Sequence, residues 1–334
     1  MALSIGHLTR KPLEGCHFSI ESTAAAIREG LAGDKNLRIV PVVMPVYSKG
    51  IFPRLQLLFF VRRQLFDVYH VVGDIHFLVM GLPRRRLLVT IHDVLFLYPR
   101  SGIPWLLLWF FWVFLPAHRA RRIVAVSHFT KGEIVRLTSC SARKIVVIPS
   151  LISQAFVPYP REFTVECPVI LHLGAAWNKN LEGHVEALCG IQCHLVVVGK
   201  LSDRQQRLLV KSGISHEIHT ALPVLEMPGL YRSCDLLLFS SLAEGFGLPI
   251  LEAQATGRVV ITSPGGATEE TAGEGALYAN PREPKEIRQA VLRLIADPGL
   301  REQLLAAGFR NLAKYNRNQI MEAHRRLYHQ FIDL

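Results

Sequence analysis

Short, unbroken apolar runs alternate with longer amphipathic segments along most of the chain. Runs of this kind predict strands that are buried on both faces of a parallel sheet, and the segments between them predict helices. Repeated βα alternation predicts an α/β fold with a doubly wound parallel sheet, here formed twice. The predicted strands are 2–7, 37–43, 68–72, 87–91, 123–126, 145–148, 169–173, 194–198, 216–219, 236–239 and 259–262.

A stretch without periodicity separates the two sets of strands. Residues 154–168 contain three prolines and no repeating apolar pattern, which is typical of a linker. With 334 residues, the chain is also long for a single hydrophobic core. We therefore expect two domains, at 1–155 and 161–316, followed by a final helix within 317–334.

Composition and charge narrow the class of protein. Half of the residues are hydrophobic and 19% are charged, which is typical of a globular chain. The net charge of +11 belongs to the first half, where residues 1–160 hold 20 Lys and Arg against 8 Asp and Glu. Such asymmetry indicates an anionic partner, either a membrane surface or nucleic acid. Because base-stacking and groove-reading motifs are absent from the sequence, we do not expect nucleic acid.

The cysteines and the N-terminal sequence indicate the compartment. The six cysteines are scattered without a disulfide framework, and the first residues lack the basic region and apolar core of a signal peptide. We therefore expect a cytoplasmic protein.

Residues 103–115 form the most apolar segment and include Trp105, Trp109 and Trp112. The segment is too short to span a bilayer, which requires about 17–25 residues. Arginines follow directly at 119, 121 and 122. Two interpretations stay open: a core helix with a basic tail, or a helix in the membrane interface that holds the protein peripherally at the inner face of the membrane.

The segment around residues 236–257 carries the strongest chemical pattern. The predicted strand 236–239 leads into a loop with Gly245 and Gly247, and then into a helix that begins near Pro249. A helix N-terminus after a glycine loop offers backbone N–H groups and a positive dipole end to an anion.

Two carboxylates, Glu244 and Glu252, flank this anion site. Carboxylates repel a phosphate, but they accept hydrogen bonds from the hydroxyls of a sugar or a ribose. A diphosphate between two polyols, as in a nucleotide sugar, suits both features. The alternative is a structural strand–loop–helix unit with solvated glutamates.

Polar residues also follow a strand of the first half. His92 and Asp93 come directly after the strand 87–91, at the end where ligands of open parallel sheets bind. A structural hydrogen bond between the two is the alternative. His324 and His329 are five residues apart on the final predicted helix, which does not suit a helical zinc pair, so we expect them on a basic exposed surface.

The order of the motifs resembles that of the retaining GT-B glycosyltransferases of family 4 (group 1), along nearly the whole chain. Most of the motifs are short and individually weak, and the segment from Glu244 to Glu252 is the specific one. The motifs are 90–93 (TIHD), 124–131 (VAVSHFTK), 147–149 (VIP), 179–180 (KN), 198–199 (VG) and 244–253 (EGFGLPILEA).

The resemblance implies roles for individual residues. Glu252 would hold the nucleotide ribose, Glu244 would lie near the donor sugar hydroxyls, and Lys179 would pair with the diphosphate. His92 and Asp93 would lie on the acceptor side. We interpret Glu244, Lys179 and His92 as catalytic, with Glu244 positioning hydroxyls. The donor-binding set would be Gly15, Lys179, Asn180, Glu244, Gly245, Phe246, Gly247, Leu248 and Glu252.

The chain departs from the family pattern at two places. Relatives often have an arginine shortly before the lysine, where this chain has Ala175, Trp177 and Asn178, and a glycine pair where it has Gly15 and Cys16. If the resemblance holds here, this loop lacks one cation for the leaving group, so that another arginine or a helix N-terminus must share its stabilisation and Lys179 matters more.

The resemblance also implies the architecture and the reaction. Two Rossmann-like domains would face each other across a cleft, with the acceptor on 1–155 and the nucleotide sugar on 161–316, and the final helix would cross back to the N-terminal domain. A sugar would pass from UDP or GDP to a glycan or lipid-linked acceptor with retention, in cell-surface polysaccharide synthesis. We expect no cofactor and no metal, because the chain lacks an Asp-x-Asp motif. The alternative is a non-catalytic nucleotide-sugar-binding or scaffolding subunit.

Overall fold

The computed structural model describes residues 2–12, 19–220 and 222–331. For residues 19–21 and 224 it describes the backbone but not the side chains. The chain forms two compact units. One runs to Leu151 and includes the final segment from Arg317, and the other runs from Ile152 to Asn316. Each unit is described by itself below.

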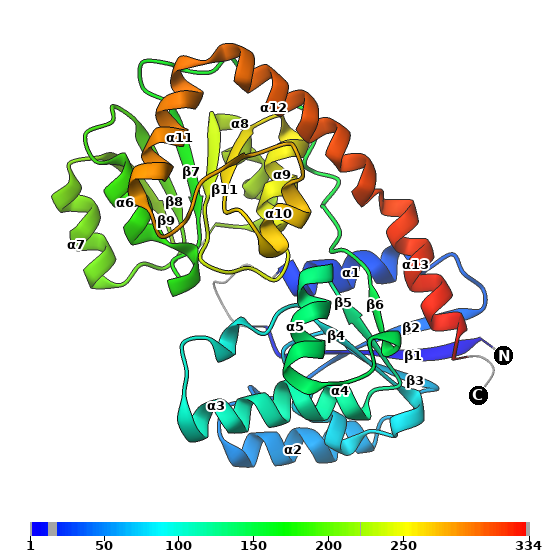
Figure 1. The fold of residues 1–334 in the computed structure, drawn as a ribbon. Coiled ribbons are helices and arrows are strands. Elements are labelled where there is room, and N and C mark those ends of the chain that lie inside the picture. The colour runs from blue at the N-terminus through cyan, green and yellow to red at the C-terminus, as the bar shows by residue number, and fades with distance from the viewer. Residues whose placement is uncertain (1, 13–18, 221, 332–334) are drawn as a thin grey trace. The chain divides into compact units, whose positions relative to one another are not determined.

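The first unit is built on a six-stranded parallel sheet with the order β2-β1-β3-β4-β5-β6 (Figure 1). The chain starts in the interior of the sheet, adds β2 on one side, and then returns to add β3 on the other. All six strands were predicted from the apolar runs. They are β1 (Leu3–Thr9), β2 (Leu37–Val43), β3 (Val68–Val71), β4 (Leu87–Ile91), β5 (Arg122–Ala125) and β6 (Ile145–Val147).

Helices cover both faces of this sheet. One face packs against α1 (Ser19–Leu31) and α13 (Arg317–His329). The other face packs against α2 (Ile51–Arg62), α5 (His128–Thr138) and the turn His76–Gly81. A helical stretch also lies on this second face, and it consists of α3 (Gly102–Leu108), a π-helical segment η4 (Trp109–Phe114) and α4 (Leu115–Arg119).

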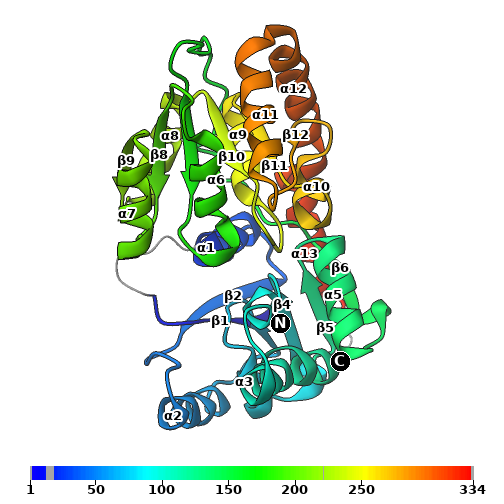
Figure 2. The same ribbon diagram turned by 60° about the vertical axis from the view of Figure 1, so that its left-hand side comes forward.

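The second unit repeats the architecture with the strand order β12-β11-β10-β7-β8-β9, again all parallel (Figure 2). The two-residue β12 was not predicted, because so short a strand has no pattern of its own. The strands are β7 (Val169–Leu173), β8 (His194–Val198), β9 (Ser215–His219), β10 (Leu236–Phe239), β11 (Val259–Thr262) and β12 (Leu277–Tyr278).

Two apolar cores lie on the two faces of this second sheet, because alternate residues of each strand point to opposite sides. One core contains α6 (Leu181–Leu188), α7 (Asp203–Ser212), α11 (Pro284–Ala296) and α12 (Pro298–Asn311). The other contains α8 (Met227–Ser233), α9 (Leu248–Thr256) and α10 (Gly266–Ala272). Short 3₁₀ turns lie at 84–86, 95–97, 142–144, 177–179, 224–226 and 312–315.

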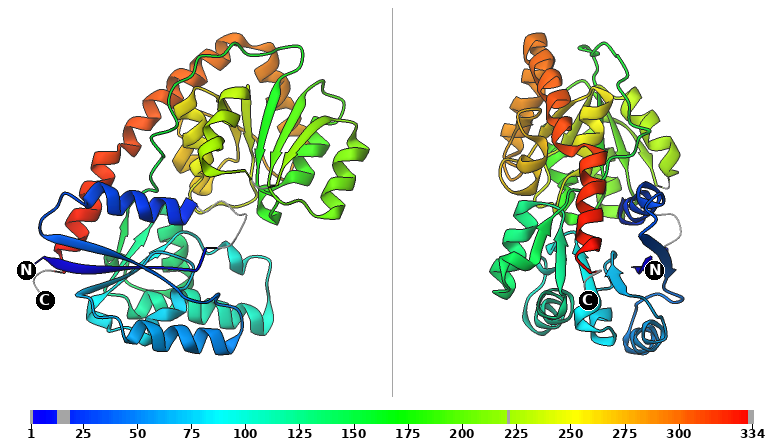
Figure 3. Two further views of the ribbon diagram at one scale, coloured as in Figure 1. Left: turned by 180° about the vertical axis from the view of Figure 1, so that it is seen from behind. Right: turned by 90° about the vertical axis from the view of Figure 1, so that its right-hand side faces the viewer.

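A buried polar network attaches α13, the red helix at the C-terminal end of the ribbon in Figure 3, to the first sheet. The Tyr328 hydroxyl lies 2.6 Å from His7 Nε2 and 2.9 Å from His70 Nδ1. His70 Nε2 lies 2.7 Å from Thr90 Oγ1. His7, His70 and Thr90 stand on three neighbouring strands, so the network ties the helix to the middle of the sheet.

The expectation that His324 belongs to an exposed basic surface was wrong. Its side chain is 3% exposed, on the face of α13 that also carries Ile320, Leu327 and Tyr328. Their spacing of three and four residues puts them on one side of a helix, which the distance from His324 to His329 does not reveal. Burial lowers the pKa of His324 to about 4.

No helix in the described ranges is long and apolar enough to cross a bilayer. Likewise, no three His, Cys, Asp or Glu side chains in these ranges are grouped as metal ligands. The expected independence from metals stays a prediction.

The buried histidines predict acid sensitivity. Burial lowers the pKa of His7 to about 3, with Arg28 and His324 adding to the effect. Unfolded histidines titrate near 6.5, so below that pH the unfolded chain binds protons that the folded unit excludes, and stability falls as the pH drops towards 4.

Replacing His324 with Leu should remove one of these sites. The free energy of unfolding, measured with urea, should fall less between pH 7 and pH 4 in His324→Leu than in the wild type, by up to about 3 kcal/mol. The surface variant His118→Gln should behave as the wild type. An equal loss in all three proteins would contradict this account.

Candidate active site

Two loops of the second unit leave its sheet at the point where the strand order reverses. The chain adds β8 and β9 on one side of β7, and then places β10 on the other side. Ligands of open parallel sheets bind at such a point, beyond the carboxyl ends of the strands. The loop after β7 carries Lys179, and the loop after β10 carries Glu244.

Lys179 and Glu244 form an ion pair. The Lys179 ammonium nitrogen lies 2.7 Å from Glu244 Oε1, and the side chains are 23% and 10% exposed. The ammonium also lies 4.7 Å from the centre of the Phe239 ring, a cation–π contact. The structure therefore brings together two of the predicted catalytic residues and holds the lysine on two sides.

Gly174 leaves the space that the Lys179 side chain occupies. A Cβ atom at position 174 would lie 2.8 Å from Lys179 Cγ, closer than such atoms approach. Gly174 also has a φ of +94°, a backbone conformation that glycine adopts most readily. Position 174 therefore requires glycine for two reasons, its positive φ and the space taken by the Lys179 side chain.

Asn180 braces the same loops. It adopts a left-handed conformation, with φ at 59°, directly before α6. Its side-chain nitrogen donates hydrogen bonds to the carbonyl oxygens of Ser240 at 3.2 Å and Pro281 at 2.7 Å. The side-chain nitrogen of Asn180, a predicted donor-binding residue, is thus engaged in hydrogen bonds to the protein itself.

A buried histidine pair joins the ends of β7 and β10, and the sequence reasoning missed it. The Nδ1 atoms of His172 and His184 lie 2.8 Å apart, His172 Nε2 lies 2.7 Å from the Gly174 oxygen, and His184 Nε2 lies 3.2 Å from the Ser240 oxygen. Burial lowers the pKa of His172 to about 4 and that of His184 well below its ordinary value, so both are neutral at pH 7. A polar residue near the end of an apolar strand, as at His172, was the available signal.

The predicted glycine loop and helix are confirmed. Gly247 precedes α9 with φ at 106°, Pro249 occupies its first turn, and Gly257 ends it with φ at 75°. Phe246 is 7% exposed and its carbonyl oxygen accepts a hydrogen bond from Thr271, so its side chain belongs to the core. A ligand role in this loop therefore falls to the backbone near Gly245, Gly247 and Leu248 rather than to the phenyl ring.

Glu252 has a neutral partner. The Tyr231 hydroxyl donates a hydrogen bond of 2.7 Å to Glu252 Oε2. Burial raises the pKa of Glu252 to about 7, and the bond from Tyr231 opposes that rise. Glu244 pairs with a cation and Glu252 with a phenol, so the two glutamates have different environments.

His92 and Asp93 belong to the first unit. His92 Nε2 donates to the Val72 oxygen at 3.0 Å, and Asp93 Oδ1 accepts from the backbone N–H of Leu95 at 2.9 Å. Among the described residues, the two side chains bond to the backbone rather than to each other.

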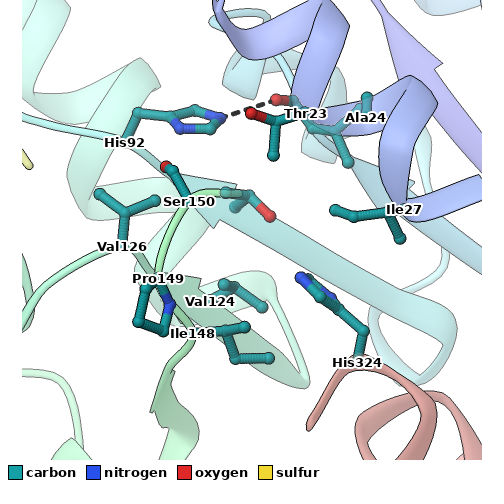
Figure 4. Close-up of a pocket in the computed structure, with 12 residues that line it drawn as sticks. Thr23, Ala24, Ile27, His92, Val124, Val126, Ile148, Pro149, Ser150 and His324 are labelled. Carbon is teal, nitrogen blue, oxygen red and sulfur yellow. Dashed lines mark hydrogen bonds between the residues drawn. The ribbon is translucent and has the colours of Figure 1, made fainter. Parts of the chain in front are cut away.

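His92 also lines a small pocket within that unit, as Figure 4 shows together with Thr23, Ser150 and His324. The free space is about 20 Å³, enough for a single water molecule. Gly15 lies outside the described residues. The acceptor-side role of His92 and Asp93 stays a prediction.

Comparison with known proteins identifies the family. A model described as "Glycosyl transferases group 1" matches residues 167–297, and one described as "Glycosyltransferase Family 4" matches residues 22–155. The chain belongs to the family 4 (group 1) glycosyltransferases. The protein is therefore an enzyme, and its reaction class is glycosyl transfer.

Two relatives are named as O-antigen chain mannosyltransferases. The O-antigen chain mannosyltransferase RfbU of Salmonella typhimurium is 25% identical over 266 residues, which are 77% of this chain and 72% of the relative. The O-antigen chain mannosyltransferase B of Escherichia coli is 28% identical over 221 residues, 59% of this chain and 57% of that protein. The glycosyltransferase thus spans little more than half of the second relative.

Solved structures show the fold. Anabaena HepE in complex with UDP and glucose has a TM-score of 0.78 and 16% identity, covering 98% of this chain and 100% of that one. WaaG, described as a glycosyltransferase involved in lipopolysaccharide biosynthesis, has a TM-score of 0.73 and 13% identity over 96% and 98% of the two chains. The expected GT-B fold with two Rossmann-like domains is confirmed.

The contact between Gly174 and Lys179 yields a matched pair of variants. Gly174→Ala should displace the Lys179 side chain and lower the rate of glycosyl transfer by about tenfold or more. Gly190→Ala carries comparable backbone strain, because Gly190 has a φ of +74°, but a Cβ there would meet nothing within 4 Å. Both variants should lose about 1 kcal/mol of stability, and only Gly174→Ala should lose activity in kcat/KM measurements. Equal activities would show that the position of Lys179 does not matter.

Proposed function

We propose that this glycosyltransferase transfers a hexosyl group from a UDP- or GDP-sugar, with retention of configuration, to a glycan or lipid-linked acceptor in cell-surface polysaccharide synthesis. The observation that carries the proposal is the Lys179–Glu244 ion pair at the ends of β7 and β10. A cation and a hydroxyl acceptor stand together there, in the unit that also holds the glycine loop and the N-terminus of α9.

The chemistry follows from charge. As the glycosidic bond to the diphosphate breaks, negative charge grows on the diphosphate oxygens. Lys179, a point charge held in place by Glu244 and the Phe239 ring, and the backbone amides at the start of α9 stabilise that charge without reorganising. Position 175–178 offers no arginine, so Lys179 is the side-chain cation of this loop.

Glu244 acts as an anchor for sugar hydroxyls. Its contact with the Lys179 ammonium neutralises part of its charge, which supports positioning rather than nucleophilic attack. Glu252 accepts hydrogen bonds from the ribose; its other carboxylate oxygen, which bonds to no described side chain, supports that role.

The relatives suggest where to begin with substrates. RfbU and mannosyltransferase B are named as O-antigen chain mannosyltransferases, which favours mannose as the first donor sugar to test. HepE was solved with UDP and glucose, which keeps UDP-sugars in the panel. Residues 161–316 would hold the donor and the first half the acceptor.

Substitution of Lys179 and Glu252 tests the donor site. Lys179→Met and Glu252→Ala should each lower kcat/KM for transfer by about 100-fold or more, since each loses a charged contact with the donor. Lys211→Met, on the exposed surface of α7, should retain full activity. Unchanged rates in the two site variants would refute the assignment.

A panel of UDP- and GDP-sugars separates the enzyme from the scaffold alternative. A ligand that binds the folded state should raise the melting temperature with concentration. Transfer or slow hydrolysis of the same sugar supports catalysis. Binding without either reaction, across a range of lipid-linked and glycan acceptors, would favour the non-catalytic subunit.

We also propose that the acceptor is presented at an anionic membrane surface, to which the first unit binds. The structure changes which residues would make the contact. Trp109 donates to the Leu137 oxygen at 2.9 Å and Trp112 to the Asp74 oxygen at 2.7 Å, so these indoles face the protein. The Arg54 guanidinium also lies over the Trp112 ring, 4.8 Å from the ring centre. This contact joins α2 to the helical stretch 102–119.

Other apolar side chains of α2 and of the helical stretch 102–119 are exposed. Phe52 is 84% exposed and Ile103 is 73% exposed. α2 and the helical stretch 102–119 both pack on one face of the first sheet, next to the turn His76–Gly81, and exposed arginines at 62, 63 and 100 accompany them. Apolar side chains with adjacent cations suit a headgroup region, and each cation contributes about 1 kcal/mol. The other exposed apolar residues of these elements are Ile51, Leu55, Phe59, Leu106, Leu107 and Phe110.

Vesicle sedimentation tests this face. The wild type should sediment with vesicles that contain phosphatidylglycerol and stay in solution with purely zwitterionic ones. The double variant Phe52→Ser, Ile103→Ser should lose sedimentation and keep its melting temperature, because both side chains are exposed. Val210→Ser, at the 72% exposed Val210 of α7, serves as the matched control. Failure of the wild type to bind anionic vesicles would refute the membrane proposal.

A further inference from the structure

Tyr231 stands beside one of the two glutamates of the site, and no sequence motif marked it. It lies in α8, and its side chain is fully buried. The Phe156 ring packs against it edge-on, with 5.2 Å between ring centres. Its own carbonyl oxygen accepts a 2.7 Å hydrogen bond from Arg258 Nε. The surroundings therefore fix both the ring and the backbone of Tyr231.

Among the described residues, the side chain that the fixed hydroxyl contacts closely is Glu252. It donates to Oε2 at 2.7 Å and lies 3.4 Å from the Pro249 oxygen. A carboxylate offers about four lone-pair positions on its two oxygens. A single donor from a rigid ring sets the rotation of the carboxylate plane and leaves the second oxygen to other donors.

We propose that Tyr231 is a positioning residue for the nucleotide: its hydroxyl orients the Glu252 carboxylate so that both ribose hydroxyls can donate to it. The proposal rests on the proposed function, because Glu252 is taken to bind the ribose. Tyr231 itself does not touch the nucleotide in this account.

The hydrogen bond also affects the charge state of Glu252. Burial raises the pKa of Glu252 to about 7, and the bond from Tyr231 lowers it. Burial also raises the pKa of Tyr231 well above its ordinary value, so the phenol remains a donor at every pH of interest. Of the neighbouring titratable groups, Cys234 is a neutral thiol, with its pKa raised to about 12 by burial, and the Arg258 guanidinium is bonded to backbone carbonyl oxygens.

These facts give a pH dependence with a definite sign. The ionised Glu252 carboxylate can accept hydrogen bonds from both ribose hydroxyls. When Glu252 is protonated, one of its oxygens carries a hydrogen and is a poorer acceptor for a ribose hydroxyl. Nucleotide affinity should therefore weaken as the pH falls through about 7. Tyr231→Phe removes a hydrogen bond to the ionised form, so the pKa of Glu252 rises further and the midpoint of the affinity profile moves to higher pH.

Calorimetric titration with UDP and with GDP between pH 6 and pH 9 tests the proposal. At pH 7, Tyr231→Phe should bind the preferred nucleotide about fivefold to tenfold more weakly than the wild type, because most of its Glu252 is protonated. At pH 9, where Glu252 is ionised in both proteins, only the lost orientation of the carboxylate remains, and Tyr231→Phe should bind no more than about threefold more weakly than the wild type. A loss that is the same at every pH, or no loss at all, would overturn the proposal.

Two further variants make the outcome specific. Tyr278→Phe removes another part-buried hydroxyl of the same unit, one that donates to the Gly273 carbonyl oxygen, and should follow the wild-type profile. Adding Tyr231→Phe to Glu252→Gln should cause no additional pH-dependent loss, because the titrating group is gone. An additional pH-dependent loss in that background would assign the effect to another group and refute the proposal.

A wrong function and a wrong role for Tyr231 would give different binding results. If the wild type binds neither UDP nor GDP, the proposed function itself is wrong. If the wild type binds one of them and Glu252→Gln weakens that binding, while Tyr231→Phe follows the wild type at every pH, the proposed function stands and the role of Tyr231 falls.

Discussion

The contact between Lys179 and Glu244 joins two loops whose residues are 65 positions apart in the chain. It exists because the strands β7 and β10 are neighbours although β8 and β9 come between them in sequence. Parallel pairing brings the carboxyl ends of both strands to one edge, and the reversal of strand order there leaves room beyond them. The absence of a side chain at Gly174 then makes space for Lys179.

Buried polar side chains stabilise the strand ends. Asn180 connects the loop after β7 to the backbone at Ser240 and Pro281, and the His172–His184 pair connects Gly174 to Ser240. Because a buried polar group without a partner costs free energy, such bonds favour one arrangement of the loops over others. A rigid arrangement suits a site that must stabilise charge without reorganising. The tie between α13 and the first sheet, through Tyr328, follows the same physical rule.

Much of this fold could be predicted from the sequence, for a physical reason. A strand covered on both faces is apolar throughout, so runs such as 236–239 identify themselves, and the glycines at 247 and 257 mark the ends of α9 because of their positive φ. Contacts between distant segments leave no such local pattern. Tyr231 reaches Glu252 only through tertiary packing, and His324 is buried because of its neighbours on α13. The tryptophans of 103–115 likewise suggested a membrane contact, whereas the indole N–H groups of Trp109 and Trp112 find acceptors inside the first unit.

A crystal structure of the protein with a bound nucleoside diphosphate, UDP or GDP according to affinity, tests the central claim most directly. The account predicts diphosphate oxygens within hydrogen-bonding distance of the Lys179 ammonium and of backbone amides at the start of α9, with the ribose hydroxyls on Glu252. A nucleotide bound with its diphosphate away from Lys179 and α9, while these residues keep their present positions, would contradict the account.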